Sequence, residues 1–172
     1  GDNRGLRLPP KIAPIQVVIV PVAANKEGVL EKAKELKEKL NNFRVEMDDR
    51  MQYTPGYKFN YWEMKGVPIR IEIGPRDIQN NKCVLVRRDT LEKMDVSLDN
   101  LEESIEKLLE EIQQNMYNMC KDNMIKRTNV AHNMDEFKKE LEENRGFIKA
   151  MFCGNPECEE KIHELTGAKS RC

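Results

Sequence analysis

An unbroken apolar segment near the start of the chain limits the possible folds most strongly. Residues 17–22 read VVIVPV, which is β-branched at nearly every position. A strand with one face in water alternates apolar and polar residues, whereas this segment is apolar on both faces. It therefore predicts a buried strand in a sheet that is covered on both sides.

The remaining pattern predicts helices and strands that could build such a sheet. Apolar residues at spacings of three and four indicate helices, and alternation of apolar and polar residues indicates strands. Pro55-Gly56 marks a turn, and Gly66 marks the end of a helix. The expected helices are residues 27–41, 57–65, 97–120 and 134–143, and the expected strands are residues 16–22, 43–47, 68–73, 82–88, 93–96 and 145–152. This order predicts an α/β fold, in which a mixed sheet carries helices on its faces.

Composition excludes several classes of protein. The 172 residues are 39% hydrophobic and 34% charged, which is typical of a globular domain, and no segment approaches the length of a membrane span. The net charge of −1 points to no partner, so binding of phosphates would need a local basic patch. Five cysteines are an odd number for a secreted disulfide framework, which favours a reducing, cytoplasmic setting.

Catalytic motifs are weak in this sequence. There is no glycine-rich phosphate loop after the first strand, and neither His132 nor His163 belongs to a recognisable nucleophile arrangement. The pair Asp48-Asp49 follows a predicted strand, where it could act as acid or base or simply form a solvated turn.

One cysteine pair is a candidate metal site. Cys153 and Cys158 flank a loop with glycine and proline, which can direct two thiolates at one zinc ion. A closed zinc site needs two further ligands, and only His163 and Cys172 are near in sequence. Two free thiols in a loop explain the pattern equally well.

The segment YKFNYWEMKG at residues 57–66 carries most of the information about function. It places four aromatic residues beside lysines, an arrangement by which proteins stack on unpaired bases while they contact phosphates. The alternative is a helix that simply buries Phe59 and Trp62 in the core, and the pattern alone favours that alternative.

Several segments together resemble prolyl-tRNA synthetase of the archaeal and eukaryotic type. They are GDNRGLRLPP at residues 1–10 with Ala13-Pro14, PGYKFNYWEMKGVPIRIEIGPRD at 55–77, VRRDT at 86–90, the Cys153 and Cys158 pair, and Thr166-Gly167-Ala168. The resemblance implies that residues 1–14 end a catalytic domain. It further implies that residues 15–125 form the anticodon-binding domain of a class II aminoacyl-tRNA synthetase, which is a mixed five-stranded sheet flanked by helices. Residues 126–172 would begin a zinc-binding C-terminal domain as a small α+β extension.

The same resemblance implies a set of binding residues. Phe59 resembles the aromatic residue that packs on an anticodon base, and Glu63, Arg70 and Asp77 resemble the groups that read the two guanines of a proline anticodon. Lys93 lies near a further family lysine. The metal candidates are Cys153 and Cys158, and no catalytic residue is expected.

The resemblance also implies partners and cofactors. The parent enzyme would use ATP to attach proline to tRNA(Pro) in the cytoplasm as a homodimer, without membrane or DNA partners, and this part alone is expected to be inactive. Zinc is expected only as an incomplete site. An alternative role is that of a docking or dimer-support module with little tRNA affinity of its own.

Overall fold

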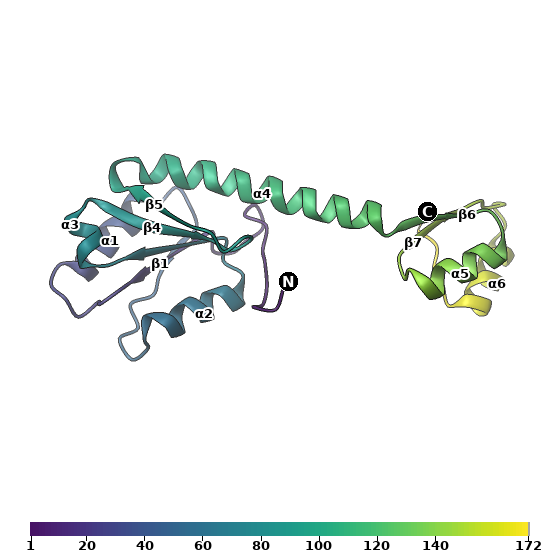
Figure 1. Ribbon diagram of the computed structural model, residues 1–172, viewed down its shortest axis with the longest axis horizontal. Coiled ribbons are helices and arrows are strands. Elements are labelled where there is room, and N and C mark those ends of the chain that lie inside the picture. The colour runs from purple at the N-terminus through teal and green to yellow at the C-terminus, as the bar shows by residue number, and fades with distance from the viewer. Residues whose placement is uncertain (172) are drawn as a thin grey trace. The chain divides into compact units, whose positions relative to one another are not determined.

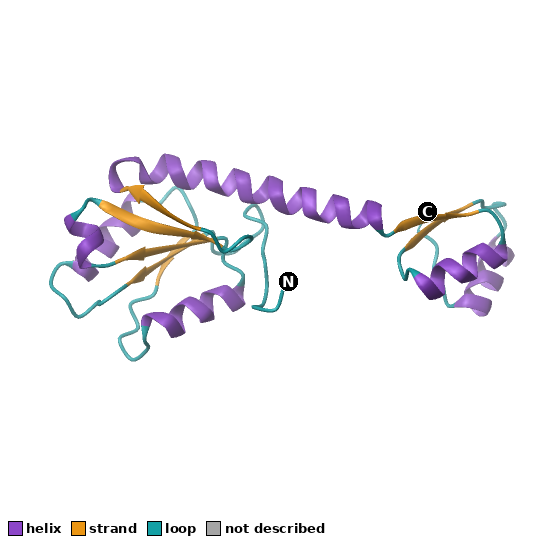
Figure 2. Ribbon diagram, in the orientation of Figure 1, coloured by secondary structure: helices purple, strands orange, loops and turns teal. Residues whose placement is uncertain are grey.

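The computed structural model describes residues 1–171, and the chain divides into two compact units, Gly1–Tyr117 and Asn118–Cys172. Each unit contains its own sheet (Figures 1 and 2). The long helix α4 (Leu101–Lys126) begins in the first unit and ends in the second. None of the helices within residues 1–171 is long and apolar enough to cross a membrane.

The first unit is built on a mixed five-stranded sheet, as the resemblance implies. Its strand order is β2-β1-β3-β4-β5, where β1 pairs in parallel with β2 and β3, and β3, β4 and β5 pair antiparallel. The strands are β1 (Val17–Pro21), β2 (Val45–Met47), β3 (Ile69–Ile73), β4 (Lys82–Arg87) and β5 (Lys93–Ser97). Every residue of β1 is buried, which confirms the prediction of a strand covered on both sides.

One face of this sheet carries the larger core. The helices α1 (Val29–Lys39) and α4 pack against it, and the short helices α3 (Pro75–Gln79) and η1 (Leu98–Asn100) connect strands and helices near its rim. The core holds buried apolar side chains that recur at helical spacing in α1 and α4 and at every second position in the strands: Val17, Ile19, Ala33, Leu36, Leu40, Ile69, Ile71, Ile73, Leu85, Leu101, Ile105, Leu108 and Ile112.

The helix α2 (Pro55–Lys65) covers part of the opposite face (Figure 1). Thr54 caps its start by accepting a hydrogen bond from the Tyr57 backbone N–H at 3.3 Å, and Gly66 ends it in the left-handed conformation with φ 75°. Phe59 and Trp62 pack against the buried apolar residues of this face. The predicted helix and its stop at Gly66 are therefore confirmed.

The alternation predicted for β3 is present, but the polar face of the strand is not open to water. Ile69, Ile71 and Ile73 enter the larger core, and Arg70 and Glu72 point to the face that α2 covers. Arg70 is only 6% exposed. Alternation alone would leave this polar side in water, because the sequence pattern cannot show that a helix lies over it.

The second unit contains a two-stranded parallel sheet with two helices. Its elements are β6 (Thr128–Ala131), α5 (Met134–Glu143), β7 (Phe147–Ala150) and α6 (Pro156–Thr166). The helix at 134–143 and the strand within 145–152 were predicted. The strand β6 was not, because four residues with two polar side chains carry no clear alternation, and its strand geometry comes from pairing with β7.

Candidate nucleic-acid interface

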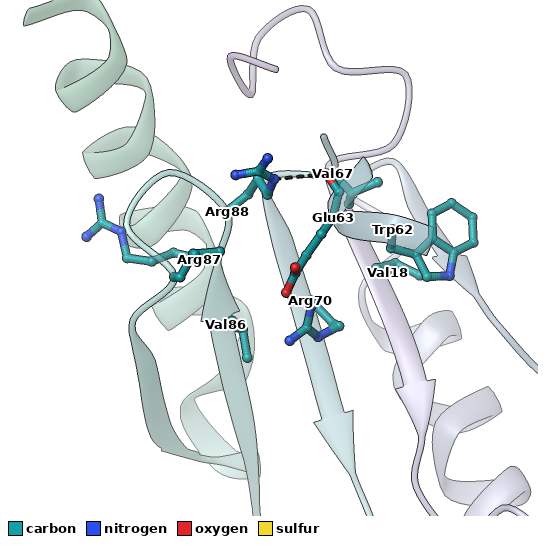
Figure 3. A pocket seen from close by; sticks show the side chains of 9 residues that line it. Val18, Trp62, Glu63, Val67, Arg70, Val86, Arg87 and Arg88 are labelled. Atoms are coloured by element: carbon teal, nitrogen blue, oxygen red, sulfur yellow. Dashed lines mark hydrogen bonds and ion pairs between the residues drawn. The ribbon is translucent and has the colours of Figure 1, made fainter. Parts of the chain in front are cut away.

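Arg70 lies at the centre of the polar cluster that the structure builds on the α2 face of the sheet. It is the second residue of β3, and the sheet register places Val18 of β1 and Val86 of β4 on either side of it. These residues line a small pocket together with Trp62, Glu63, Val67, Arg87, Arg88 and Leu91 (Figure 3). The valines and the helix leave the Arg70 side chain only 7% exposed, so its charge must be balanced mainly by neighbouring groups.

Two carboxylates provide this balance. Arg70 Nη1 donates to Glu63 Oε1 at 3.0 Å, while its Nε and Nη2 donate to Glu72 Oε1 at 3.1 and 2.9 Å. The side chains of Glu63 and Glu72 are only 11% and 13% exposed. Burial raises the pKa of Glu63, but hydrogen bonds from Arg70 and Arg4 outweigh burial and hold that pKa below its usual value.

An aromatic ring and a lysine complete the cluster. The Arg70 guanidinium carbon lies 4.3 Å from the centre of the Phe59 ring, and Lys93 Nζ lies 5.9 Å from the same centre. Lys93 Nζ also contacts both carboxylate oxygens of Glu72 at 3.4 Å. Lys93 is exposed, so the cluster runs from a buried arginine to a cation at the surface. An aromatic ring of this kind can stack on a base, while a cation beside it contacts a phosphate.

Asp77 does not join this cluster by any contact in the structure. It lies beyond the end of β3, in the short helix α3, and its Oδ2 accepts the backbone N–H of Gly74 at 2.8 Å. Of the five residues predicted for base recognition, the structure brings together Phe59, Glu63, Arg70 and Lys93.

Sequence reasoning missed two residues of the cluster, Glu72 and Arg4. Glu72 follows Arg70 by two positions in an alternating strand, so the period of two already placed both on one face. Arg4, which is 59 positions away in sequence, contacts Glu63 Oε2 at 3.2 Å, and no local pattern signals that contact.

The aromatic segment 57–66 is divided between two roles. Phe59 and Trp62 face the sheet, as the alternative of a buried helix predicts. Tyr57 and Tyr61 lie elsewhere on α2 and stack in series with Tyr53, with ring centres 4.3 Å apart for Tyr53 and Tyr57 and 6.5 Å apart for Tyr57 and Tyr61.

The pair Asp48-Asp49 contains one buried and one exposed residue. Asp48 is 2% exposed and accepts hydrogen bonds from Arg50 at 2.7 and 2.9 Å and from the indole N–H of Trp62 at 2.8 Å. The amine of Lys58 lies 3.9 Å from its carboxylate. Asp48 is therefore not part of a solvated turn, because it is buried. Its contacts give it a structural role, in which it joins the end of β2 to α2.

The candidate metal ligands Cys153 and Cys158 lie next to each other at the start of α6. A hydrogen bond from the Asn155 backbone and another from Cys158 lower the pKa of the Cys153 thiol, and the neighbouring Cys153 raises the pKa of Cys158. Within residues 1–171, no group of three or more His, Cys, Asp or Glu side chains could hold a metal ion. Cys172 lies outside the described residues. A closed zinc site needs four ligands, and the described residues bring no such group together around the two thiols.

Alkylation by iodoacetamide at neutral pH is expected to separate the cysteines. Cys153 is exposed and its thiol is acidified, whereas Cys83 is fully buried and burial raises its pKa to about 12. We therefore expect Cys153 to react fastest, exposed Cys120 to serve as an internal reference, and Cys83 to react only after unfolding in urea. Mass spectrometry of the digested peptides measures the order. Rapid labelling of Cys83 in the folded chain would contradict the structure.

Comparison with known proteins agrees with this geometry. A family model described as the anticodon binding domain matches residues 16–108, and one described as prolyl-tRNA synthetase, C-terminal, matches residues 134–172. The chain is 60% identical over 173 aligned residues to the proline–tRNA ligase of Alkaliphilus oremlandii. It is 56% identical to that of Clostridium botulinum strain ATCC 19397 and 53% identical to proline–tRNA ligase 2 of Clostridioides difficile.

These matches cover nearly the whole chain but only 36% of each relative, so the chain spans about a third of the length of the curated proteins that it matches. The anticodon model alone covers more than half of the chain, and it coincides with the five-stranded sheet and its first helices. The chain therefore belongs to the anticodon-binding domain family, in the form in which prolyl-tRNA synthetase carries it, followed by that enzyme's own C-terminal domain.

Proposed function

We propose that this chain reads the anticodon of tRNA(Pro) as the C-terminal part of a proline–tRNA ligase. The observation that carries the proposal is the cluster of Phe59, Glu63, Arg70 and Lys93 on one face of the sheet, within a domain of the anticodon-binding family. Residues 15–125 would be the reading domain, residues 1–14 the end of the catalytic domain and residues 126–172 the start of the C-terminal domain.

The chemistry of the cluster suits guanine, which a proline anticodon presents twice. A carboxylate accepts hydrogen bonds from guanine N1–H and N2–H, and each of its oxygens has more than one lone pair. Glu63 can therefore keep Arg70 and Arg4 as partners and still accept from the base. Its depressed pKa keeps it ionised and able to accept at neutral pH.

The other members of the cluster would assist this recognition. Arg70 Nη2 donates one hydrogen to Glu72, and its second hydrogen remains for the O6 or N7 acceptor of a guanine. The exposed amine of Lys93 would contact a phosphate, and Phe59 would pack against a base. Asp77 would contact the RNA beyond the end of β3, apart from the other four residues.

The parent enzyme would activate proline with ATP, attach it to tRNA(Pro) and act as a cytoplasmic homodimer. We propose that the present chain does not catalyse these steps by itself, since the two family models that it matches describe an anticodon-binding domain and a C-terminal domain. Cys153 and Cys158 would give two of the four ligands of a structural zinc site and would leave the other two to come from outside the described residues.

Binding to two tRNA transcripts tests this function. We expect the chain to bind a tRNA(Pro) transcript more tightly than a copy in which both anticodon guanines are replaced by adenines, by about 10- to 100-fold at moderate salt. Fluorescence anisotropy at two salt concentrations measures both affinities. Equal affinities that weaken together with salt would show phosphate attraction only, and would favour the alternative of a docking or dimer-support module.

A further inference from the structure

The first eight residues form a strap that lies against the end of α2. The backbone N–H of Leu6 donates to the Met64 carbonyl at 3.0 Å, and that of Leu8 donates to the Gly66 carbonyl at 3.2 Å. The approach is close, because a Cβ atom on Gly66 would lie 2.8 Å from the backbone carbon of Leu6. Glycine at position 66 thus serves both the left-handed helix end and the docking of this strap.

An ion pair fixes the beginning of the strap. Asp2 accepts from Arg88 Nη1 and Nη2 at 2.7 and 2.6 Å, and Arg88 is only 3% exposed. Figure 3 shows the third contact of this arginine, in which its Nε donates to the backbone carbonyl of Glu63 at 2.9 Å. Arg88 therefore joins the strap to the backbone of Glu63.

A second contact from the strap reaches the carboxylate itself. Arg4 Nη1 lies 3.2 Å from Glu63 Oε2, whereas Arg70 Nη1 lies 3.0 Å from Oε1. Each oxygen of Glu63 is thus held by a different arginine, one from the strap and one from β3. Without Arg4 the carboxylate would keep a single anchored oxygen and could rotate about its terminal torsion, which has a broad energy minimum.

We propose that the strap orients Glu63 for guanine recognition, with Arg4 and the Asp2–Arg88 pair as positioning residues rather than contacts to RNA. This inference rests on the proposed function. The two N–H groups of a guanine edge need both oxygens of the carboxylate to lie in the plane of the base. A carboxylate that is already held in this orientation loses less entropy on binding. Arg4 itself is a half-exposed ion-pair partner, so its removal costs the fold little.

The experiment compares Arg4→Ala, Arg4→Lys, Glu63→Gln and the double variant Arg4→Ala/Glu63→Gln in the full 172-residue chain. Lys34→Ala is the matched control, since it removes one positive charge from an exposed position of α1, on the far side of the sheet. The affinity of each variant is measured for the tRNA(Pro) transcript and for the transcript with both anticodon guanines replaced. Thermal unfolding followed by circular dichroism confirms that each variant is folded.

We expect Arg4→Ala to weaken binding of the normal transcript by about fivefold and to leave binding of the altered transcript unchanged. Arg4→Lys should recover most of the loss, because it restores a cation beside Oε2. In the Glu63→Gln background, Arg4→Ala should cause no further loss beyond that of Lys34→Ala, since Arg4 acts through the carboxylate.

Two results would overturn the proposal. An equal loss with both transcripts would make Arg4 a phosphate contact, and a full additional loss in the Glu63→Gln background would show that Arg4 acts independently of the carboxylate. Failure of the proposed function is distinguishable from both, because the unmodified chain would then bind the two transcripts equally.

Discussion

Replacing Arg70 by alanine is expected to abolish discrimination between the normal and the guanine-substituted tRNA(Pro) transcripts. Arg70 supports the ring of Phe59 and holds both Glu63 and Glu72, so its loss disorders the whole cluster. We expect the affinity for the normal transcript to fall by about 10- to 100-fold, towards that of the altered one. Fluorescence anisotropy with both transcripts measures the change.

The same substitution is expected to destabilise the fold. It leaves the carboxylates of Glu63 and Glu72, only 11% and 13% exposed, without the cation between them, and breaking such a pair costs about 3 kcal/mol. Urea unfolding at pH 7 measures this free energy.

A second variant separates binding from stability. In Arg70→Ala/Glu72→Ala one of the two carboxylates that Arg70 held is also removed, while Arg4 still contacts Glu63. We expect part of the lost stability to return and the discrimination to stay absent. Normal discrimination by Arg70→Ala would remove Arg70 from the proposed site. An unchanged free energy of unfolding would show that the buried cluster does not form as described.

Replacing Asp48 by asparagine is expected to have the largest effect on stability outside the proposed site. Asp48 is the carboxylate partner of Arg50 and the acceptor of the Trp62 indole, and it lies beside the buried amine of Lys58. An amide of the same size cannot balance these cations, so we expect a loss of about 3 kcal/mol in the free energy of unfolding at pH 7. Asp49→Asn is the matched control, because Asp49 is exposed.

The effect of Asp48→Asn should depend on pH. Burial raises the pKa of Asp48, but hydrogen bonds from Arg50 and Trp62 outweigh burial, and the pKa lies below its usual value. A carboxyl with a lower pKa in the folded state contributes stability above its unfolded pKa of about 3.9 and loses it as the pH falls through the folded value. The difference between wild type and Asp48→Asn should therefore be full at pH 7 and shrink below about pH 4. A difference independent of pH would contradict the ionised contact.

Local patterns predicted the elements of the first unit because most of them are encoded within a few residues. Each signal involves residues that are neighbours in sequence. They are the apolar run of β1, the periodic leucines and isoleucines of α4, and Gly66 after α2. The strand β6 escaped prediction because its partner, β7, lies sixteen residues or more away and its own residues carry no period.

The residues of the candidate site were named only through resemblance to a family, since Arg70 and Glu72 in an alternating strand look like any solvated polar face. The burial of that face could not be predicted from the sequence pattern, because it depends on how α2 packs over β3. The docking of Arg4 and Asp2 on Glu63 and Arg88 was equally hidden, since those partners are distant in sequence.

The sequence by itself determined the order of the main strands and helices of the first unit, the buried central strand and the ends of α2, because periodicity and capping are local properties of the chain. Only the tertiary structure decided that Arg70 is buried between two carboxylates, that Asp48 is an internal acceptor and that the strap reaches Glu63. Those features arise when segments far apart in sequence bury the same charged side chains. Burial strengthens the interaction between opposite charges, and a local sequence pattern does not show it.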